Sequence, residues 1–434
     1  MTLLVISPDY ASHLLPLAAL GAAWRDAGER VVVASGPATA GIVESFGYER
    51  AHLQLGRGSN PGVIRADHQP DAEADSLRGF FDATREGMVP TLAYQARERL
   101  VDLMWQPVQK ARDTLAVIEA VRPDAILVDH LAYSARLALW AADVPHADVV
   151  LGHPTALPVG GEVYGCPPTW PRAFRPDPTG MARLEALCRQ VATGFTAEWN
   201  RAAAQLAPGL PTVDDAFALH GPLVLYNYPE ELAAPDRAAG LPPHRYLGGS
   251  LRDEPADPEV DAWLSTDEPF VYVSFGSFLS VRGDVLARVV EALRGTGVRA
   301  AIASGSTPAA ELGELPADWL VRAYLPQVRL LRAAAATVTH GGNNSVTEAV
   351  ATATPLLVLP FSTDQFAGAE AVERTGVGEA LDPNTASVGE LRAAVVRLLD
   401  LSGVGAETLR SAARALELEP GPARALRVAT AVRA

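Results

Sequence analysis

The sequence predicts an α/β protein made of two doubly wound domains that face each other across a cleft. Three observations support this fold class. The chain has 434 residues, more than a typical single domain holds. Short apolar runs typical of buried parallel strands alternate with helical patterns in both halves. Residues 240–258, with four Pro and three Gly, continue neither pattern and form the predicted linker.

The first half opens with a strand, a helix and a second strand. "TLLVIS" and "RVVVAS" are short apolar runs, and "HLLPLAALGAAWRDAGE" between them is apolar at helical spacing. Such a unit favours parallel strands. "PDAILVDH" and "GPLVLYNY" predict later strands of the same sheet. We therefore expect residues 1–240 to form the first domain.

A similar alternation fills the second half. The predicted strands are "FVYVSFGS", "VRAAIASG", "WLVRAYLP", "ATVTH" and "PLLVLPF", separated by helical runs such as "DVLARVVEALRGTG". We expect residues 241–417 to form the second domain and residues 418–434 to form a terminal helix that packs back on the first. In doubly wound sheets, ligands bind beyond the carboxyl ends of the strands, so the loops there should face the cleft.

Charge and composition exclude several classes of partner. The net charge is −15 and no basic run is present, which argues against nucleic acid or an anionic membrane. The two cysteines have no metal or redox spacing. The N-terminus lacks the pattern of a signal peptide. No apolar run approaches the roughly 18 residues of a membrane span. We expect a cytoplasmic protein. The sequence leaves open whether it forms a homodimer.

The segment "VTHGGNNSVTEA", residues 338–349, carries more polar groups than a strand-to-helix turn needs. Gly341 and Gly342 permit a sharp turn and close backbone approach. The helix that follows presents free N–H groups and the positive end of its dipole, which favours an anion. A carboxylate one turn further on, at Glu348, suits the hydroxyls of a ribose. The alternative is a capping box, Ser345-x-x-Glu348, with ordinary turn chemistry.

Residues 323–378 as a whole resemble the donor-binding signature of family 1 nucleotide-sugar glycosyltransferases, which have the GT-B fold. "VYVSFGS" and "SHLLPLAALGAAWRDAGE" extend the resemblance over most of the chain. It is strongest to actinobacterial enzymes that glycosylate natural products such as antibiotics. The resemblance implies a GT-B fold and a donor that is a TDP- or UDP-sugar.

The resemblance also implies roles for the donor-site residues. Tyr324 would stack on the base, the Leu325 backbone would pair with it, and Gln327 and Glu348 would approach the ribose. The residues that would hold the diphosphate are Ser277, His340, Gly341, Gly342, Asn344 and Ser345. Asp364 and Gln365 would contact the transferred sugar. For this last pair, helix capping through Ser362-x-x-Gln365 is the alternative.

His13 is the candidate catalytic base. It follows the first strand, and the ordinary pKa of a histidine suits proton removal near neutral pH. The pattern "HLLPL" resembles the family's catalytic His motif, and Asp129 matches the position of an Asp that orients the His. Ser12 replaces the Gly that relatives usually carry before the His. His130 is the competing base, and a structural role is the alternative for His13 and Asp129.

We therefore expect an inverting glycosyltransferase of hexosyltransferase type, acting on a hydroxyl of a small hydrophobic aglycone in secondary metabolism. No Asp-x-Asp motif is present, so we expect neither metal nor cofactor. Phe80, Phe81 and Trp105, together with the stretch "YGCPPTWPRAF" at residues 164–174, are candidates for the acceptor pocket, although they could equally be core. A nucleotide-sugar epimerase of the same fold and a non-catalytic partner protein are the alternative functions.

Overall fold

The computed structural model describes residues 1–60, 71–266, 268–279 and 281–431. Its first domain contains a seven-stranded sheet of order β3-β2-β1-β4-β5-β6-β7, and every pairing in it is parallel. The strands are β1 Thr2–Ile6, β2 Arg30–Ser35, β3 Glu49–His52, β4 Ala125–Asp129, β5 Ala147–Val150, β6 Leu223–Tyr226 and β7 His244–Tyr246. The predicted parallel sheet is thus confirmed.

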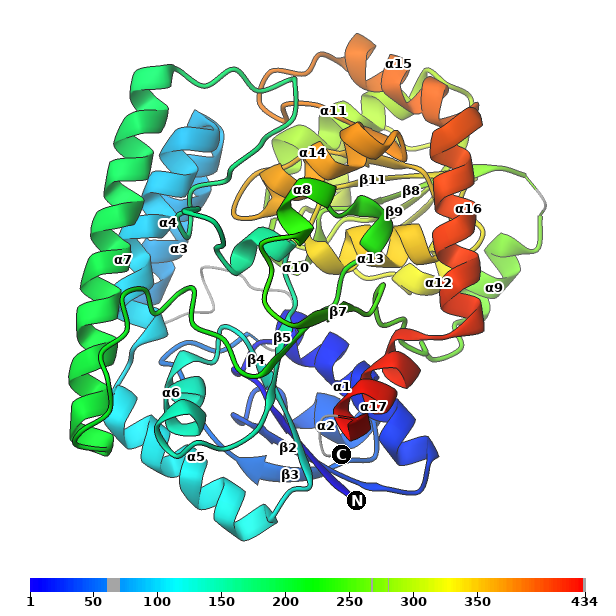
Figure 1. Cartoon of the computed structure of the whole chain (residues 1–434). Coiled ribbons are helices and arrows are strands. Elements are labelled where there is room, and N and C mark those ends of the chain that lie inside the picture. Colours follow the sequence, from blue (N-terminus) through cyan, green and yellow to red (C-terminus); the bar gives the residue numbers. More distant parts are fainter. Residues whose placement is uncertain (61–70, 267, 280, 432–434) are drawn as a thin grey trace.

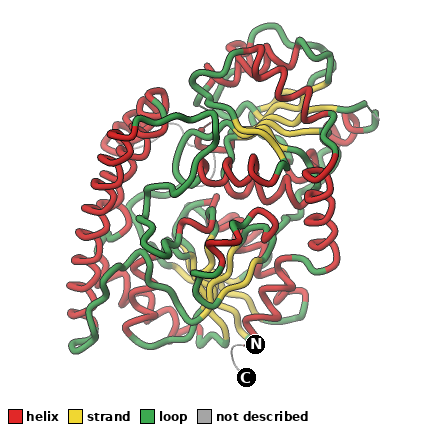
Figure 2. Tube along the Cα trace, turned by 45° about the horizontal axis from the view of Figure 1, so that its top comes forward, coloured by secondary structure: helices red, strands yellow, loops and turns green. Residues whose placement is uncertain are grey.

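The second domain contains a six-stranded sheet, again wholly parallel, of order β10-β9-β8-β11-β12-β13. Figure 2 shows the two sheets in separate layers. The strands are β8 Phe270–Ser274, β9 Arg299–Ala303, β10 Leu320–Arg322, β11 Ala336–Thr339, β12 Leu356–Val358 and β13 Gly378–Ala380. Two doubly wound domains are therefore present, as the alternation of strands and helices predicted.

Helices connect the strands and surround both sheets (Figure 1). In the first domain they are α1 Ala11–Asp26, α2 Ala40–Ser45, α3 Asp71–Glu86, α4 Met88–Leu103, α5 Pro107–Val121, α6 Tyr133–Ala141, α7 Pro178–Leu206 and α8 Pro235–Ala238. Those that follow are α9 Pro258–Leu264, α10 Gly276–Leu279, α11 Gly283–Arg294, α12 Gln327–Leu331, α13 Asn343–Ala351, α14 Gln365–Thr375, α15 Val388–Leu399, α16 Gly403–Leu418 and α17 Gly421–Ala431. Short 3-10 turns lie at Pro154–Ala156, Glu230–Leu232 and Ala309–Leu312.

The segment between the domains differs from the predicted linker. β7 lies within residues 240–258 and pairs with β6, so the first sheet continues past residue 240. The chain then crosses to the second domain without regular structure, from Leu247 to Asp257. Ser250 in this crossing is buried, and its hydroxyl donates to the Pro16 carbonyl of α1 at 3.2 Å. The crossing is therefore packed against the first domain.

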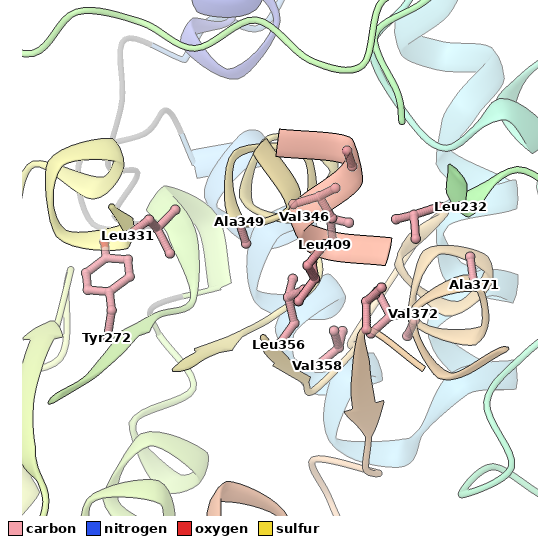
Figure 3. Packing of buried hydrophobic residues seen from close by; sticks show 14 of the residues in the cluster. Leu232, Tyr272, Leu331, Val346, Ala349, Leu356, Val358, Ala371, Val372 and Leu409 are labelled. Carbon is pink, nitrogen blue, oxygen red and sulfur yellow. The ribbon is translucent and has the colours of Figure 1, made fainter. Parts of the chain in front are cut away.

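A hydrophobic cluster crosses the domain boundary and supports α13. Val346 and Ala349 on the buried face of α13 pack with Leu356 and Val358 of β12 (Figure 3). Leu232 of the first domain belongs to the same cluster. Because apolar burial contributes roughly 25 cal/mol per Å², this shared core stabilises the contact between the domains.

Two helical contacts further join the domains. After α16, the chain returns to the first domain, where α17 packs on α1 (Figure 1). Ala425 of α17 is buried in one cluster with Leu14 and Leu17 of α1. In the opposite direction, Phe81 of α3 packs into a cluster built mainly from the second domain. The terminal helix thus returns to the first domain, as the expected fold requires.

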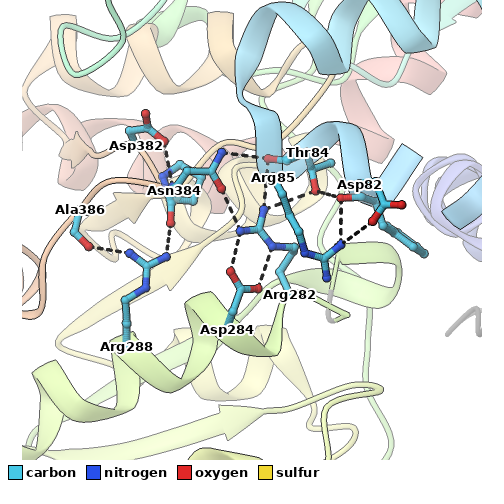
Figure 4. A network of polar contacts seen from close by, with 11 residues as sticks. Asp82, Thr84, Arg85, Arg282, Asp284, Arg288, Asp382, Asn384 and Ala386 are labelled. Atoms are coloured by element: carbon cyan, nitrogen blue, oxygen red, sulfur yellow. Dashed lines mark hydrogen bonds and ion pairs between the residues drawn. The ribbon is translucent and has the colours of Figure 1, made fainter. Parts of the chain in front are cut away.

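A buried polar network also holds α3 to the second domain (Figure 4). Arg282, only 1% exposed, donates to the carbonyl and hydroxyl oxygens of Thr84 at 3.2 and 3.3 Å. It also forms two bonds with Asp284, at 2.7 and 2.8 Å. Asn384 donates to the same Thr84 carbonyl at 2.9 Å. The Thr84 carbonyl lies in the last turn of α3, where a cation is favourable.

Candidate active site

A cavity of about 760 Å³ opens between the two domains, beyond the carboxyl ends of both sheets. Its wall contains His13 of α1 and Leu131 after β4 in the first domain. The second domain contributes His340 after β11 and Asp364 before α14. The cavity lies where ligands bind in doubly wound sheets. Residues from both predicted sets, the catalytic one and the donor-binding one, therefore line the same cavity.

His13 and Asp129 form a hydrogen-bonded pair beside this cavity. The distance between His13 Nδ1 and Asp129 Oδ2 is 2.7 Å. The Asp129 side chain is fully buried, and its other oxygen accepts the Leu131 backbone N–H at 2.9 Å. An ionised carboxylate can only accept, so Nδ1 carries the proton. In the neutral ring, Nε2 is then the nitrogen free to take a proton, and the His13 side chain remains 25% exposed.

The pair shifts the pKa of each partner. Burial lowers the pKa of His13, but the charge and hydrogen bond of Asp129, with a smaller contribution from Asp364, raise it above its ordinary value. Burial raises the pKa of Asp129, and its interaction with His13 reverses this, so that the pKa lies below the ordinary value. The arrangement thus stabilises an imidazolium on His13 after it accepts a proton.

His130 lies next to this pair but differs from His13 in burial and in the direction of its pKa shift. Its side chain is buried, and burial lowers its pKa to about 4. Its Nδ1 is 3.6 Å from Asp129 Oδ1, beyond hydrogen-bond distance, and neither ring nitrogen has a hydrogen-bond partner among the described residues. His130 also lines the cavity. At neutral pH it is therefore an uncharged ring whose nitrogens are both buried.

The predicted anion site forms at the start of α13. The helix begins at Asn343, after Gly342 as its N-cap, and has no side-chain cap. The capping box Ser345-x-x-Glu348 is therefore not formed, and the first N–H groups of the helix are available to a ligand. Gly341 has a φ of +80°, and a Cβ there would lie 2.5 Å from a methyl carbon of Val358. A glycine is thus required at position 341, because the backbone has a positive φ and because no room remains for a side chain.

His340 is fixed against the backbone beside this helix start. A Cβ on Gly342 would lie 2.4 Å from His340 Nε2, and one on Gly276 would lie 2.8 Å from Cε1. Burial lowers the pKa of His340 to about 4, so its ring is neutral at pH 7. Ser345 also lines the cavity. The side chain of Ser277 lies outside the described residues.

The two asparagines at the start of α13 contact the first domain. Asn344 Nδ2 donates to the Ser12 carbonyl at 2.9 Å, directly before His13. Asn343 Nδ2 donates to the carbonyls of Leu151 and Asn227 at 2.6 and 3.0 Å. The sequence assigned no role to Asn343. These bonds place the start of α13 opposite the candidate base.

The nucleoside end of the predicted donor site has an arrangement that the sequence did not reveal. Tyr324 is 64% exposed and lines the cavity beside Leu325 and Gln327. Glu348 is 3% exposed, is not part of the cavity wall, and accepts from Gln327 Nε2 at 2.5 Å. Arg252, from the crossing segment, lines the cavity and donates to the other Glu348 oxygen at 3.0 Å.

Asp364 and Gln365 occupy the loop before α14. The Asp364 Oδ2 atom accepts the backbone N–H of His153 at 2.5 Å, across the domain boundary. Gln365 Oε1 accepts the N–H groups of Phe361 and Ser362 at 2.9 and 3.1 Å. One half of the alternative capping interaction, from Gln365 back to Ser362, is thus present. Both residues nevertheless line the cavity.

The three aromatic candidates for an acceptor pocket are separated in the structure. Phe80 lines the cavity, whereas Phe81 is 7% exposed and is not in its wall. Trp105 also lies outside the wall, with the Lys110 ammonium 4.9 Å from the centre of its ring. Tyr164, from the predicted stretch 164–174, lines the cavity, as does Tyr94, which the sequence did not single out. Of the predicted aromatic residues, Phe80 and Tyr164 are thus at the site.

Two further findings concern the described residues alone. They contain no group of three or more His, Cys, Asp or Glu side chains that could hold a metal ion. Within the same ranges, no helix is long and apolar enough to cross a membrane.

Comparison with known proteins relates both the sequence and the fold to glycosyltransferases. Residues 297–429 match the erythromycin biosynthesis protein CIII-like C-terminal domain. The oleandomycin glycosyltransferase of Streptomyces antibioticus is 29% identical over 64% of this chain and 61% of its own length. A PGL/p-HBAD biosynthesis glycosyltransferase of Mycobacterium tuberculosis is 33% identical over 41% of this chain and 40% of its own. The chain spans less than two thirds of the length of these curated relatives.

Solved structures match over nearly the whole chain. The glycotransferase of kitacinnamycin has a TM-score of 0.66 at 23% identity, over 98% of this chain and 97% of that chain. The glycosyltransferase VinC, solved with DTDP, has a TM-score of 0.65 at 18% identity, over 99% and 100%. The chain therefore has the GT-B fold seen in antibiotic glycosyltransferases, and residues 297–429 of its second half are similar to the erythromycin CIII-like C-terminal domain.

Proposed function

We propose that the protein is an inverting glycosyltransferase that moves a sugar from a TDP- or UDP-sugar to a hydroxyl of a small, largely apolar natural product. The observation that carries this proposal is the position of the His13–Asp129 pair and the α13 N-terminus on one cavity. The first is suited to remove a proton and the second to hold an anion. A transfer to an alcohol with a diphosphate leaving group requires both.

The first half of the reaction is proton removal from the acceptor. His13 Nε2 takes the proton of the acceptor hydroxyl as the oxygen attacks the anomeric carbon of the donor. The imidazolium that forms is stabilised by Asp129, which already holds Nδ1 in the required tautomer. Because the hydroxyl attacks from the side opposite the leaving group in a single displacement, the configuration at the anomeric carbon inverts.

The second half is departure of the nucleoside diphosphate. As the new C–O bond forms, the bond from the anomeric carbon to the diphosphate breaks, and its electron pair leaves with the diphosphate oxygen. The free N–H groups at the start of α13, with His340 and Ser345, would stabilise this charge. Gly341 and Gly342 allow the backbone to approach the leaving diphosphate closely. These donors make a metal ion unnecessary in the proposed mechanism, and no cofactor takes part.

The remaining donor contacts follow from the cavity wall. Tyr324 offers an exposed ring for stacking on the base, and the Leu325 backbone and Gln327 lie beside it. Asp364 and Gln365, which also line the cavity, would contact the transferred sugar. VinC is described with DTDP and the rhamnosyltransferase SpnG with thymidine diphosphate, which supports a nucleoside diphosphate as the leaving group here.

Turnover with and without an acceptor tests the proposal. TDP- and UDP-sugars should each be incubated with a panel of alcohols and phenols, and products followed by mass spectrometry and proton NMR. We expect release of nucleoside diphosphate that depends on acceptor, and a product with inverted anomeric configuration. Sugar that is epimerised or released without acceptor would instead favour the epimerase. Failure of the folded protein to bind any nucleoside diphosphate would overturn the proposal.

A further inference from the structure

Arg252 separates the buried carboxylate of Glu348 from the cavity. The Glu348 side chain is 4% exposed, and both of its oxygens are engaged. Arg252 donates to one at 3.0 Å, and Gln327 Nε2 donates to the other at 2.5 Å. Arg252 and Gln327 both line the cavity, whereas Glu348 does not. The surface that a bound nucleoside meets is therefore a guanidinium beside an amide.

Arg252 is held in this position by a second carboxylate. Its NH2 atom lies 3.4 Å from Oε1 of Glu254, whose side chain is also 4% exposed. The other Glu254 oxygen accepts the backbone N–H of Arg329 at 2.9 Å, which ties the pair to α12. One guanidinium thus balances two buried carboxylates, and its side chain is only 17% exposed. Because both carboxylates lose stabilisation if it leaves, Arg252 remains at the wall.

We infer that Arg252 makes this site favour a 2′-deoxyribonucleoside diphosphate over a ribonucleoside diphosphate. The inference rests on the proposed function, which places the nucleoside between Tyr324 and Gln327. A guanidinium has five donors and no acceptor. A sugar hydroxyl that meets it can accept a hydrogen bond, but needs a separate acceptor for its own proton.

The number of hydrogen-bond acceptors at the cavity wall decides whether ribose or 2′-deoxyribose binds more tightly. Gln327 Nε2 is directed at Glu348, so the amide oxygen is the part of this side chain that can accept, and Tyr272 Oη lies 3.5 Å from it. A 3′-hydroxyl can donate to this oxygen and accept from Arg252. A 2′-hydroxyl adds a second proton, and the carboxylate that could accept it lies behind Arg252. Leaving such a donor unpaired weakens binding by about tenfold.

Calorimetric titration with TDP, dUDP and UDP tests the inference, because dUDP and UDP differ only at the 2′-position. The native protein should bind TDP and dUDP about tenfold more tightly than UDP. Two variants should remove the preference by exposing Glu348 to the cavity. Arg252→Lys keeps the charge on a shorter side chain. Arg252→Gln combined with Glu254→Gln removes one charge of each sign, which protects the fold. In both, the dUDP to UDP ratio should fall to about twofold or less.

Arg322→Lys is the matched control. Arg322 also pairs with carboxylates next to the crossing segment, donating to Glu259 at 2.9 Å and contacting Asp257, but it does not line the cavity. This variant should keep the native preference. Equal affinity of the native protein for dUDP and UDP, or a preference that survives in both Arg252 variants, would overturn the inference alone. If none of the three nucleotides binds, the proposed function itself fails.

Discussion

The Nδ1 atom of His13 lies 2.7 Å from Oδ2 of Asp129, although the two residues are 116 positions apart in the chain. The end of β4 and the start of α1 bring them together, because β1 and β4 are adjacent parallel strands. The buried carboxylate of Asp129 gives the partly buried His13 ring a fixed tautomer and orientation. This relationship makes the proposed base testable through rate, through pH and through binding.

Replacing the base should affect transfer far more than donor binding. General-base catalysis contributes typically 10²- to 10⁴-fold, so we expect His13→Ala to lower transfer to an alcohol by that order. The affinity for the nucleoside diphosphate should change little, because the diphosphate contacts come from the second domain. Initial rates and calorimetry separate the two effects. Near-normal turnover of the variant with an alcohol would show that His13 is structural.

The rate should rise with pH through the pKa of His13. Only the neutral imidazole can take a proton, and Asp129 raises the pKa of His13 above its ordinary value of about 6.5. Asp129→Asn removes the charge that raises it, so the ascending limb should move to lower pH while the maximal rate falls. A pH profile of kcat/KM measures both. An unmoved limb in Asp129→Asn would contradict the pairing.

The neighbouring histidine provides a control for this profile. Burial lowers the pKa of His130 to about 4, so its titration lies well below the expected limb. His130→Phe should therefore leave the midpoint of the limb in place, whatever it does to acceptor affinity. A shift of the midpoint in this variant would identify His130 as part of the titrating unit.

Loss of His340 should weaken nucleotide binding without lowering stability much. Hydrogen bonds to a charged group are worth about 1.5 to 3 kcal/mol, so His340→Ala should reduce affinity for the nucleoside diphosphate about 10- to 100-fold. Calorimetry and a thermal melt without ligand measure the two quantities. His220→Ala, at an exposed histidine of the first domain, is the control. Unchanged affinity in His340→Ala would exclude it from the diphosphate site.

Removal of divalent metal should leave turnover intact. The proposed mechanism stabilises the leaving diphosphate with the α13 N-terminus and neighbouring side chains. Transfer rates in excess EDTA should therefore equal those without it. A loss of activity that Mg²⁺ or Mn²⁺ restores would show that these donors are insufficient alone.

The buried Arg282 should contribute strongly to stability. Arg282→Ala removes the cation from the last turn of α3 and from Asp284, and leaves the hydroxyl of Thr84 without that donor. Asp284 is half exposed, so water compensates part of the loss, and we expect about 2 to 3 kcal/mol of destabilisation. Chemical denaturation measures it. Arg189→Ala breaks an exposed pair with Glu185 and should cost about 1 kcal/mol or less.

Most strands with a continuous apolar run were predictable from the sequence, whereas three of the four edge strands were not. Two strands depart from this pattern: the edge strand β10 was predicted from "WLVRAYLP", and the buried interior strand β5 was not predicted. "TLLVI" and "FVYVS" correspond to β1 and β8, both interior strands of their sheets and buried on both faces. β3, β7 and β13 are edge strands of three or four residues, and β3 is largely exposed. Such segments lack a continuous apolar run. Their pairing depends on neighbours distant in the sequence.

The same limit applies to the site. The turn at Gly341 and Gly342 and the helix from Asn343 follow from local chemistry, so the sequence located them. Arg252 lies in a segment that has the composition of a linker, and its role depends on contacts with Glu348 and Glu254. No local pattern reports that a carboxylate one turn into a helix will be covered by an arginine 96 residues earlier.

The shared core at the domain boundary bears on the making of hybrids with related enzymes. Leu232 packs on α14 within the cluster that also contains Val346 and Ala349. Exchange of the second half alone would therefore join surfaces that did not evolve together. The exchanged half would also bring the α17 helix of the other enzyme, which would then have to pack on an α1 from this chain. We therefore expect a hybrid to fold when the residues on both sides of these contacts come from the same parent enzyme. A junction near residue 250 with the native α17 restored should give more soluble hybrids than the same junction without it.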